Sequence, residues 1–154
     1  MNLVVLDACV LVAAADPEDV THSASRDFLE ALVRQGVSVR LPEFAVTEIA
    51  CALARRLRDP VAARRLAIGG LAAVRAVEVP MDSGFLAQAT LIGTRHFLRG
   101  ADALYVTAAE MTGGGASFGA GAAMSSIGRL SVTVEPVRAK TAGSGDVGET
   151  KVES

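Results

Sequence analysis

The feature that most constrains the fold of this chain is its opening segment, residues 3–12, which reads LVVLDACVLV. Four apolar residues precede Asp7, and a second apolar run follows it directly. This pattern predicts a strand buried on both faces, a sharp exit at the acid and then a short helix. Asp7 is therefore expected at the carboxyl end of a strand, where open α/β sheets hold their ligands. An Asp in this position is also a good helix cap, so both roles remain open.

Strand and helix patterns alternate along the rest of the chain. Further strands are expected at 37–41, 77–79 and 131–134, with a weaker one at 116–118. Helices are expected between the 16–19 turn and Gly36, at about 44–58, from Pro60 to about 70, after Asp82 or Ser83, at 101–111 and, weakly, at 120–127. This alternation predicts an α/β fold, a three-layer α/β/α sandwich around a short, mostly parallel sheet of four to five strands.

Composition indicates one domain, residues 1–138, followed by a polar tail at 139–154. The tail contains almost no apolar residues, so we expect it to be disordered. Of the 154 residues 51% are hydrophobic and only 4% aromatic, which predicts a core of Ala, Val and Leu. Cys9 and Cys51 lie in apolar segments and are expected to be small core residues. The N-terminus lacks the pattern of an export signal, so we expect a cytoplasmic protein with no membrane segment.

Two further acids stand in apolar surroundings. Glu48 is the single charged residue of the segment 44–54, and Asp102 directly precedes a strongly apolar helix face. Burying a lone carboxylate is unfavourable, so each must lie at a rim, be protonated or be paired with a cation. Either one could also be an acid favoured by the positive end of the helix dipole. A metal site is the economical explanation for three such acids at the edges of elements.

These residues resemble a known family. The strand exit at Asp7, the pattern P-x5-E-I-x-x-A-L over residues 42–53 and the segment ADALY at 101–105 are similar, in order and spacing, to PIN-domain ribonucleases. More narrowly, they resemble the toxin subunits of VapBC-type toxin–antitoxin pairs. The resemblance covers roughly residues 1–137, and ADALY is its most specific motif.

The resemblance implies an acidic pocket that binds Mg²⁺ or Mn²⁺ and hydrolyses RNA phosphodiester bonds. Asp7, Glu48 and Asp102 match the catalytic, metal-binding positions of the family. Carboxylate oxygens are the ligands that such hard ions prefer, and a bound ion can activate water and offset charge on the phosphate. The implied partners are an RNA substrate, an antitoxin-like protein and a second copy of the chain in a homodimer.

The chain departs from the family pattern at a fourth acid. The family has a hydroxyl-x-Asp element after its fourth strand, which falls here near residues 119–121, and no Asp or Glu occurs between Glu110 and Glu135. Cys9 also stands where the family often has Ser or Asn. These departures predict weak activity, and they leave open an alternative: a PIN-like module that binds an antitoxin-like partner or RNA without cleavage.

One basic cluster, formed by Arg55, Arg56, Arg58, Arg64 and Arg65, spans the end of one predicted helix and the start of the next. A solvated face is one interpretation. The other is that Arg55, Arg56 and Arg58 bind RNA phosphates beside the Glu48 helix. No aromatic residues alternate with these arginines, so base stacking is not expected there.

Two other enzyme or signalling folds also place an Asp after their first strand. A phosphoaspartate enzyme of the haloacid dehalogenase kind needs a second acid two residues later, where this chain has Cys9. A receiver domain needs a partner Lys, and residues 1–138 contain none. Neither reading matches the residues as well as the PIN domain does.

Overall fold

The computed structural model describes residues 3–113 and 115–117 of the chain. In these residues strands and helices alternate as the sequence predicts. The elements are β1 (Leu3–Leu6), α1 (Ala8–Ala15), α2 (His22–Arg34), β2 (Ser38–Pro42), α3 (Ala45–Leu57), α4 (Pro60–Ala73), β3 (Val77–Val79), α5 (Ser83–His96), α6 (Gly100–Thr112) and β4 (Gly115–Ser117).

The described strands form one parallel sheet in the order β3-β2-β1-β4. β1 lies beside both β2 and β4, with Val4 opposite Val39 and Val5 opposite Ala116. Val4, Val5 and Leu6 are all buried, so β1 is covered on both faces as its apolar run predicts. The α/β class and the parallel sheet are therefore confirmed. The fifth strand expected at 131–134 lies outside the described residues, and the three-layer arrangement stays a prediction.

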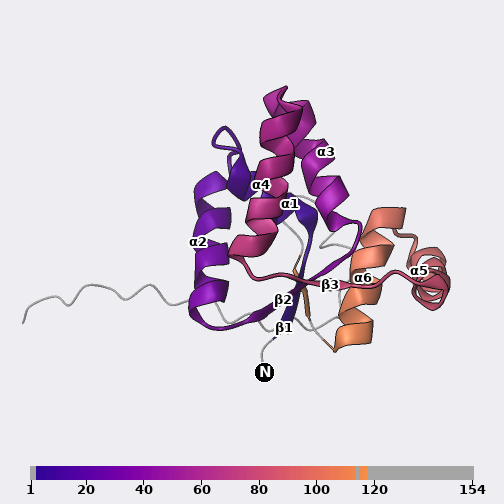
Figure 1. Ribbon diagram of the computed structural model, residues 1–154. Helices are drawn as coiled ribbons and strands as arrows, with labels where there is room; N and C mark the ends of the chain where they lie inside the picture. The colour runs from indigo at the N-terminus through magenta and orange to yellow at the C-terminus, as the bar shows by residue number, and fades with distance from the viewer. Residues whose placement is uncertain (1–2, 114, 118–154) are drawn as a thin grey trace, which may run out of the picture.

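The helices gather into two groups around the sheet (Figure 1). In this view α3 and α4 rise together above the strands, whereas α6 lies to the right with α5 on its outer side. α6 also contacts β1 and β2 directly. The carboxyl end of β1, where Asp7 lies, is therefore near α6, which carries Asp102, and α1 contacts α3, which carries Glu48.

Short-range signals set where the helices begin and end. Asp59 accepts hydrogen bonds from the backbone N–H groups of Val61 and Ala62 at the start of α4, and Pro60 fills the first helical position. Asp82 caps α5 through the N–H of Phe85, at 2.8 Å. Gly36 follows α2 with a φ of 65°, a left-handed conformation that favours glycine. These boundaries agree with the predicted ones to within a few residues.

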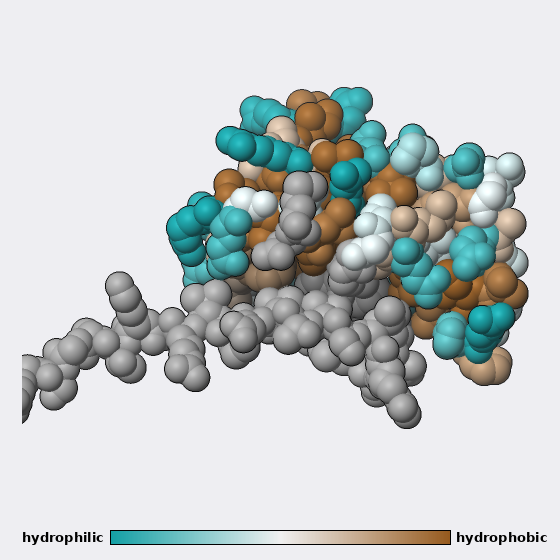
Figure 2. All heavy atoms as spheres, turned by 90° about the horizontal axis from the view of Figure 1, so that it is seen from below, coloured by the Kyte–Doolittle hydropathy of each residue, from teal (hydrophilic) through white to brown (hydrophobic). Residues whose placement is uncertain are grey.

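Most of the core side chains that the structure describes are Ala, Val and Leu, as the composition predicts, and two aromatic side chains are buried among them. The largest fully buried side chains include Tyr105, Phe85, Leu6, Leu41 and Ile49. Apolar side chains also reach the surface among hydrophilic ones, as the brown areas of Figure 2 show on one face. Exposed examples in the described residues are Val20, Val61, Ile68 and Phe97.

The prediction that the two cysteines are core residues is wrong, because both Cys9 and Cys51 are exposed. α3 buries Ala45, Ile49 and Leu53, which are spaced four residues apart on one face. Cys51 lies two positions from Ile49 and Leu53, so the helical period places it on the opposite face. An apolar segment therefore did not imply burial of each of its residues.

Three other predictions fall on residues outside the described ranges: the helix at 120–127, the family element near 119–121 and the tail at 139–154. The boundary of the domain at residue 138 lies there as well. In the part of the chain that the structure describes, no helix is long and apolar enough to span a membrane.

Candidate active site

Asp7 lies between β1 and α1 and caps that helix. Its Oδ1 accepts the backbone N–H of Cys9 at 2.8 Å, and its backbone is extended, with φ −73° and ψ 144°. The capping role considered from the sequence is therefore real. It does not exclude a second role, since the cap holds a half-buried carboxylate in a defined orientation at the carboxyl end of the strand.

Glu48 lies in the first turn of α3 and meets Tyr105 of α6. The Tyr105 hydroxyl donates a hydrogen bond to Glu48 Oε2 at 2.8 Å. Burial raises the pKa of the Glu48 carboxyl, and the hydrogen bond from Tyr105 opposes part of that rise. The negative charges of Asp7 and Asp102 raise this pKa further, while the positive charge of Arg99 lowers it.

Asp102 lies in the first turn of α6 and is held by the arginine three residues before it. Arg99 Nε donates to Asp102 Oδ2 at 2.8 Å, and a terminal nitrogen of Arg99 donates to Oδ1 at 3.1 Å. The Asp102 side chain is 14% exposed, whereas that of Arg99 is 75% exposed. Asp102 first, and then Asp7 and Glu48, raise the pKa of Arg99, because each favours its positive charge.

We call Asp7, Glu48 and Asp102 the acidic cluster, because the negative charges of both aspartates raise the pKa of the Glu48 carboxyl. They come from three different elements, and the charge of each aspartate acts on Glu48. The start of α1, the first turn of α3 and the first turn of α6 supply the three carboxylates. Arg99 is the cation that this cluster acts on. That these acids form one site at the carboxyl edge of the sheet stays a prediction.

The chemistry of the cluster suits a hard divalent cation, although its carboxylates are not arranged around one. Among residues 3–113 and 115–117, no group of three or more His, Cys, Asp and Glu residues has the spacing of metal ligands. Both Asp102 oxygens face Arg99, and one oxygen each of Asp7 and Glu48 accepts a hydrogen bond within the protein. The cluster nevertheless has three carboxylates and, among the described residues, only the Arg99 guanidinium beside them. It therefore offers the oxygen donors and the excess negative charge that Mg²⁺ or Mn²⁺ requires.

Two residues of the cluster, Tyr105 and Arg99, were not identified from the sequence as functional. Each lies three positions from Asp102 on α6 or at its start, so each shares a helix side with it. Tyr105 is also the single tyrosine of the chain and is 1% exposed. Its spacing from Asp102 was the available signal, but only the fold places its hydroxyl on Glu48.

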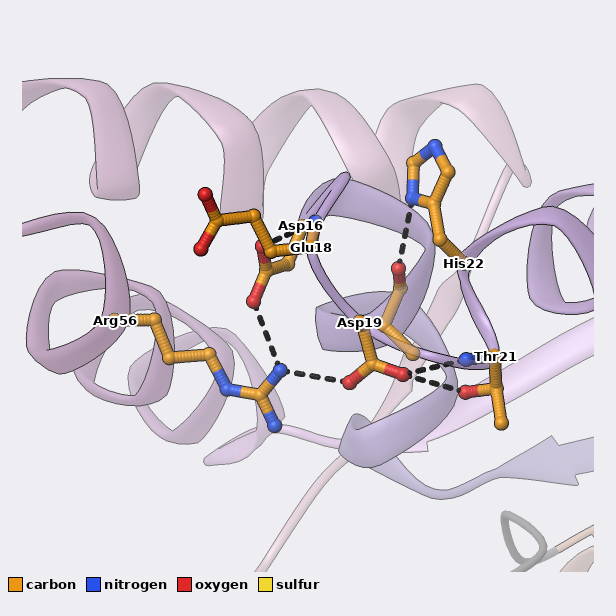
Figure 3. Close-up of polar contacts among 7 residues, drawn as sticks. Asp16, Glu18, Asp19, Thr21, His22 and Arg56 are labelled. Carbon is orange, nitrogen blue, oxygen red and sulfur yellow. Dashed lines mark hydrogen bonds and ion pairs between the residues drawn. The ribbon is translucent and has the colours of Figure 1, made fainter.

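The predicted basic cluster lies at the other end of α3. Glu48 is in the first turn of that helix and Arg55 and Arg56 are in its last, a rise of about 12 Å along the axis. Figure 3 shows Arg56 reaching between Asp16 and Asp19, and one of its terminal nitrogens donates to the two carboxylates at 2.9 and 2.7 Å. We call these three residues the Arg56 clamp.

The Arg56 clamp gives a structural role to Arg56, a member of the predicted basic cluster, and to Asp16 of the predicted turn. Asp16 also accepts the N–H of Glu18, which confirms its expected place in a turn. Hydrogen bonding to Arg56 lowers the pKa of Asp16 and lowers that of Asp19 to about 2. RNA binding is one of two interpretations of Arg55, Arg56 and Arg58. All three are exposed, but Arg56 is held by two aspartates.

Comparison with known families supports the reading of the fold. A family model described as PIN domain matches residues 4–116 of the chain. This range includes every residue of the acidic cluster. A search of curated proteins found no match to the chain.

Proposed function

The chain belongs to the PIN domain family, and from this premise we propose that it is a metal-dependent endoribonuclease of the VapC toxin type. It hydrolyses RNA phosphodiester bonds with a Mg²⁺ or Mn²⁺ ion held by Asp7, Glu48 and Asp102. PIN domains are a nuclease-type fold. The observation that carries the proposal is that the charges of Asp7, before α1, and Asp102, in α6, both act on the carboxyl of Glu48 in α3.

Each residue of the cluster has a part that follows from its surroundings. The Cys9 N–H orients Asp7, and the Tyr105 hydroxyl orients Glu48, so two of the three ligands are held in place before an ion binds. Asp102 supplies the third carboxylate once Arg99 no longer occupies it. When bound, the ion activates water and offsets negative charge on the phosphate.

The alternative is a PIN-like module that binds RNA or an antitoxin-like partner without cleavage. Two observations of the structure favour it: both oxygens of Asp102 accept hydrogen bonds from Arg99, and the described residues contain no group that could hold a metal ion. The chain also has no acid between Glu110 and Glu135, where the family has its fourth.

The partners follow from the same proposal. An apolar groove of about 540 Å³ between α1, α2 and α4 is lined by Leu11, Leu29, Val33 and Leu66, with Arg26 and Arg65 among its polar residues. It offers a surface for an antitoxin-like protein. Exposed apolar side chains such as Val61, Ile68 and Phe97 support a homodimer, in which they would be covered. We also propose a cytoplasmic location.

The test is cleavage of single-stranded RNA by the wild-type protein and by Asp7→Asn, in Mn²⁺, in Mg²⁺ and with chelator. We expect cleavage only with a divalent ion, and a loss of about 100-fold or more in the variant. Glu110→Gln is the matched control, because Glu110 is an exposed acid on the same helix as Asp102. RNA binding without cleavage, unchanged by metal or by Asp7→Asn, would support the binding module instead.

A further inference from the structure

Arg99 and a divalent cation need the same two atoms. Both carboxylate oxygens of Asp102 accept hydrogen bonds from the Arg99 guanidinium, at 2.8 and 3.1 Å. A cation that coordinates Asp102 has to take at least one of these oxygens. Arg99 therefore occupies the oxygens of Asp102 that such a cation needs.

The surroundings of the two partners show which one is able to move. The Asp102 side chain is 14% exposed and its backbone lies within the first turn of α6, so it has little room to move. Arg99 is 75% exposed and lies just outside the helix in extended conformation. Its guanidinium can turn into water with little loss of solvation, and ion pairs with an exposed partner are held weakly.

We propose that Arg99 is the internal counter-ion of the acidic cluster in the metal-free protein, and that a divalent cation displaces it from Asp102. This inference rests on the proposed metal site. It assigns to Arg99 the role of a positioning residue that sets the affinity of the site for its ion. Without a cation, the guanidinium offsets repulsion among the three carboxylates. With one, its continued presence beside the site opposes binding.

The first experiment measures Mn²⁺ binding to the full chain by calorimetry. Arg99→Gln removes the competing charge, and we expect it to bind Mn²⁺ about tenfold more tightly than the wild type. Arg95→Gln is the matched control, since Arg95 is an exposed arginine in the last turn of α5 that makes no ion pair with Asp102. The control should bind Mn²⁺ as the wild type does.

The second experiment observes the displacement itself. In a nitrogen–proton correlation spectrum, the Arg99 Nε–H signal, assigned by its loss in Arg99→Gln, should be protected from solvent exchange by Asp102. Adding Mg²⁺, which is diamagnetic, should remove that protection. Asp102→Asn should weaken the protection before any ion is added, because the charged acceptor is gone.

The outcomes separate this inference from the proposed function. If the wild type binds Mn²⁺ and Arg99→Gln binds it no more tightly, or if the Nε–H signal stays protected at saturating Mg²⁺, the counter-ion role is overturned while the metal site stands. If neither protein binds the ion, both the inference and the metal site are overturned. The proposal is supported if Arg99→Gln, but not Arg95→Gln, binds Mn²⁺ more tightly than the wild type, and if Mg²⁺ removes the solvent protection of the Arg99 Nε–H in the wild type.

Discussion

Tyr105 offsets part of the cost of burying the Glu48 carboxylate, because its hydroxyl donates a hydrogen bond to that group. Tyr105 is 1% exposed, its ring centroid lies 5.5 Å from that of Phe44, and its hydroxyl donates a hydrogen bond to Glu48. Without a donor in the protein, a half-buried carboxylate would lose hydrogen bonds to water and form none to replace them. Burial and the nearby charge of Glu48 raise the pKa of Tyr105 itself, so the phenol stays protonated and remains a donor.

The first prediction concerns this hydrogen bond. Tyr105→Phe keeps the ring and removes only the hydroxyl, so we expect the free energy of unfolding to fall by about 1–3 kcal/mol. Urea denaturation measures the change. Glu48→Met removes the acceptor at similar side-chain length, and in that background Tyr105→Phe should have a much smaller effect. An equal effect in both backgrounds would mean that the bond contributes nothing to stability.

At the scale of elements, the contact between α5 and α6 depends on one small residue. A Cβ at Gly93 of α5 would lie 3.0 Å from the Cβ of Ala103 on α6, which is closer than most Cβ contacts in proteins. Glycine is a poor helix former, so its presence inside α5 is explained by this close approach. In contrast, a Cβ at Gly69 of α4 would meet nothing within 4 Å.

The second prediction uses these two glycines as a matched pair. Gly69→Ala should raise the free energy of unfolding by up to about 1 kcal/mol, because alanine favours the helix and meets open space. Gly93→Ala should lower it by about 1–2 kcal/mol, since the steric conflict with α6 exceeds the same helix gain. Urea denaturation of both variants checks this, and a stabilised Gly93→Ala would show that α5 can shift away.

At the scale of the whole molecule, the Arg56 clamp joins parts of the chain that are far apart in sequence. Arg56 lies at the end of α3, while Asp16 and Asp19 lie in the turn between α1 and α2, 40 and 37 residues earlier. The two aspartate side chains are 10% and 15% exposed, and that of Arg56 is 45% exposed. The clamp therefore fixes the α1–α2 turn to the far end of the helix that carries Glu48.

The third prediction is the pH dependence of this clamp. The pKa values of Asp16 and Asp19 are lowered in the folded protein, so the unfolded chain binds more protons as the solution is acidified. The stability that the clamp adds is present above the ordinary Asp pKa and is lost as the pH falls towards about 2. Arg56→Gln should lower Tm at neutral pH and approach the wild type at low pH. Arg55→Gln, which removes a neighbouring exposed charge, is the control, and a difference independent of pH would contradict the prediction.

The fourth prediction concerns metal binding by the whole fold. If the acidic cluster binds Mn²⁺ only when folded, the ion stabilises the protein by about 2.7 kcal/mol at 100 times its dissociation constant. Thermal unfolding should therefore shift upward with Mn²⁺ and return on addition of chelator. Asp7→Asn should reduce the shift. An unchanged Tm in the wild type would show that the cluster does not take up the ion.

The sequence by itself determined the features that depend on neighbours along the chain. Asp59 and Asp82 cap the helices that follow them, Gly36 ends α2, and the apolar run before Asp7 becomes a buried strand, because capping, left-handed turns and periodicity act within a few residues. The three acids of the proposed site also stand out in the sequence, since each is a charge in an apolar segment at the edge of an element.

Only the tertiary structure decided which groups face one another. Tyr105 and Glu48 are 57 residues apart, and the sequence contains no local signal that joins them. The same holds for the acids that hold Arg56. The exposure of Cys51 was also not predictable from its neighbours, because it depends on which face of α3 packs on the core. Such contacts depend on how whole elements pack, and packing is set by the sum of many weak interactions across the fold rather than by any one residue and its neighbours in the chain.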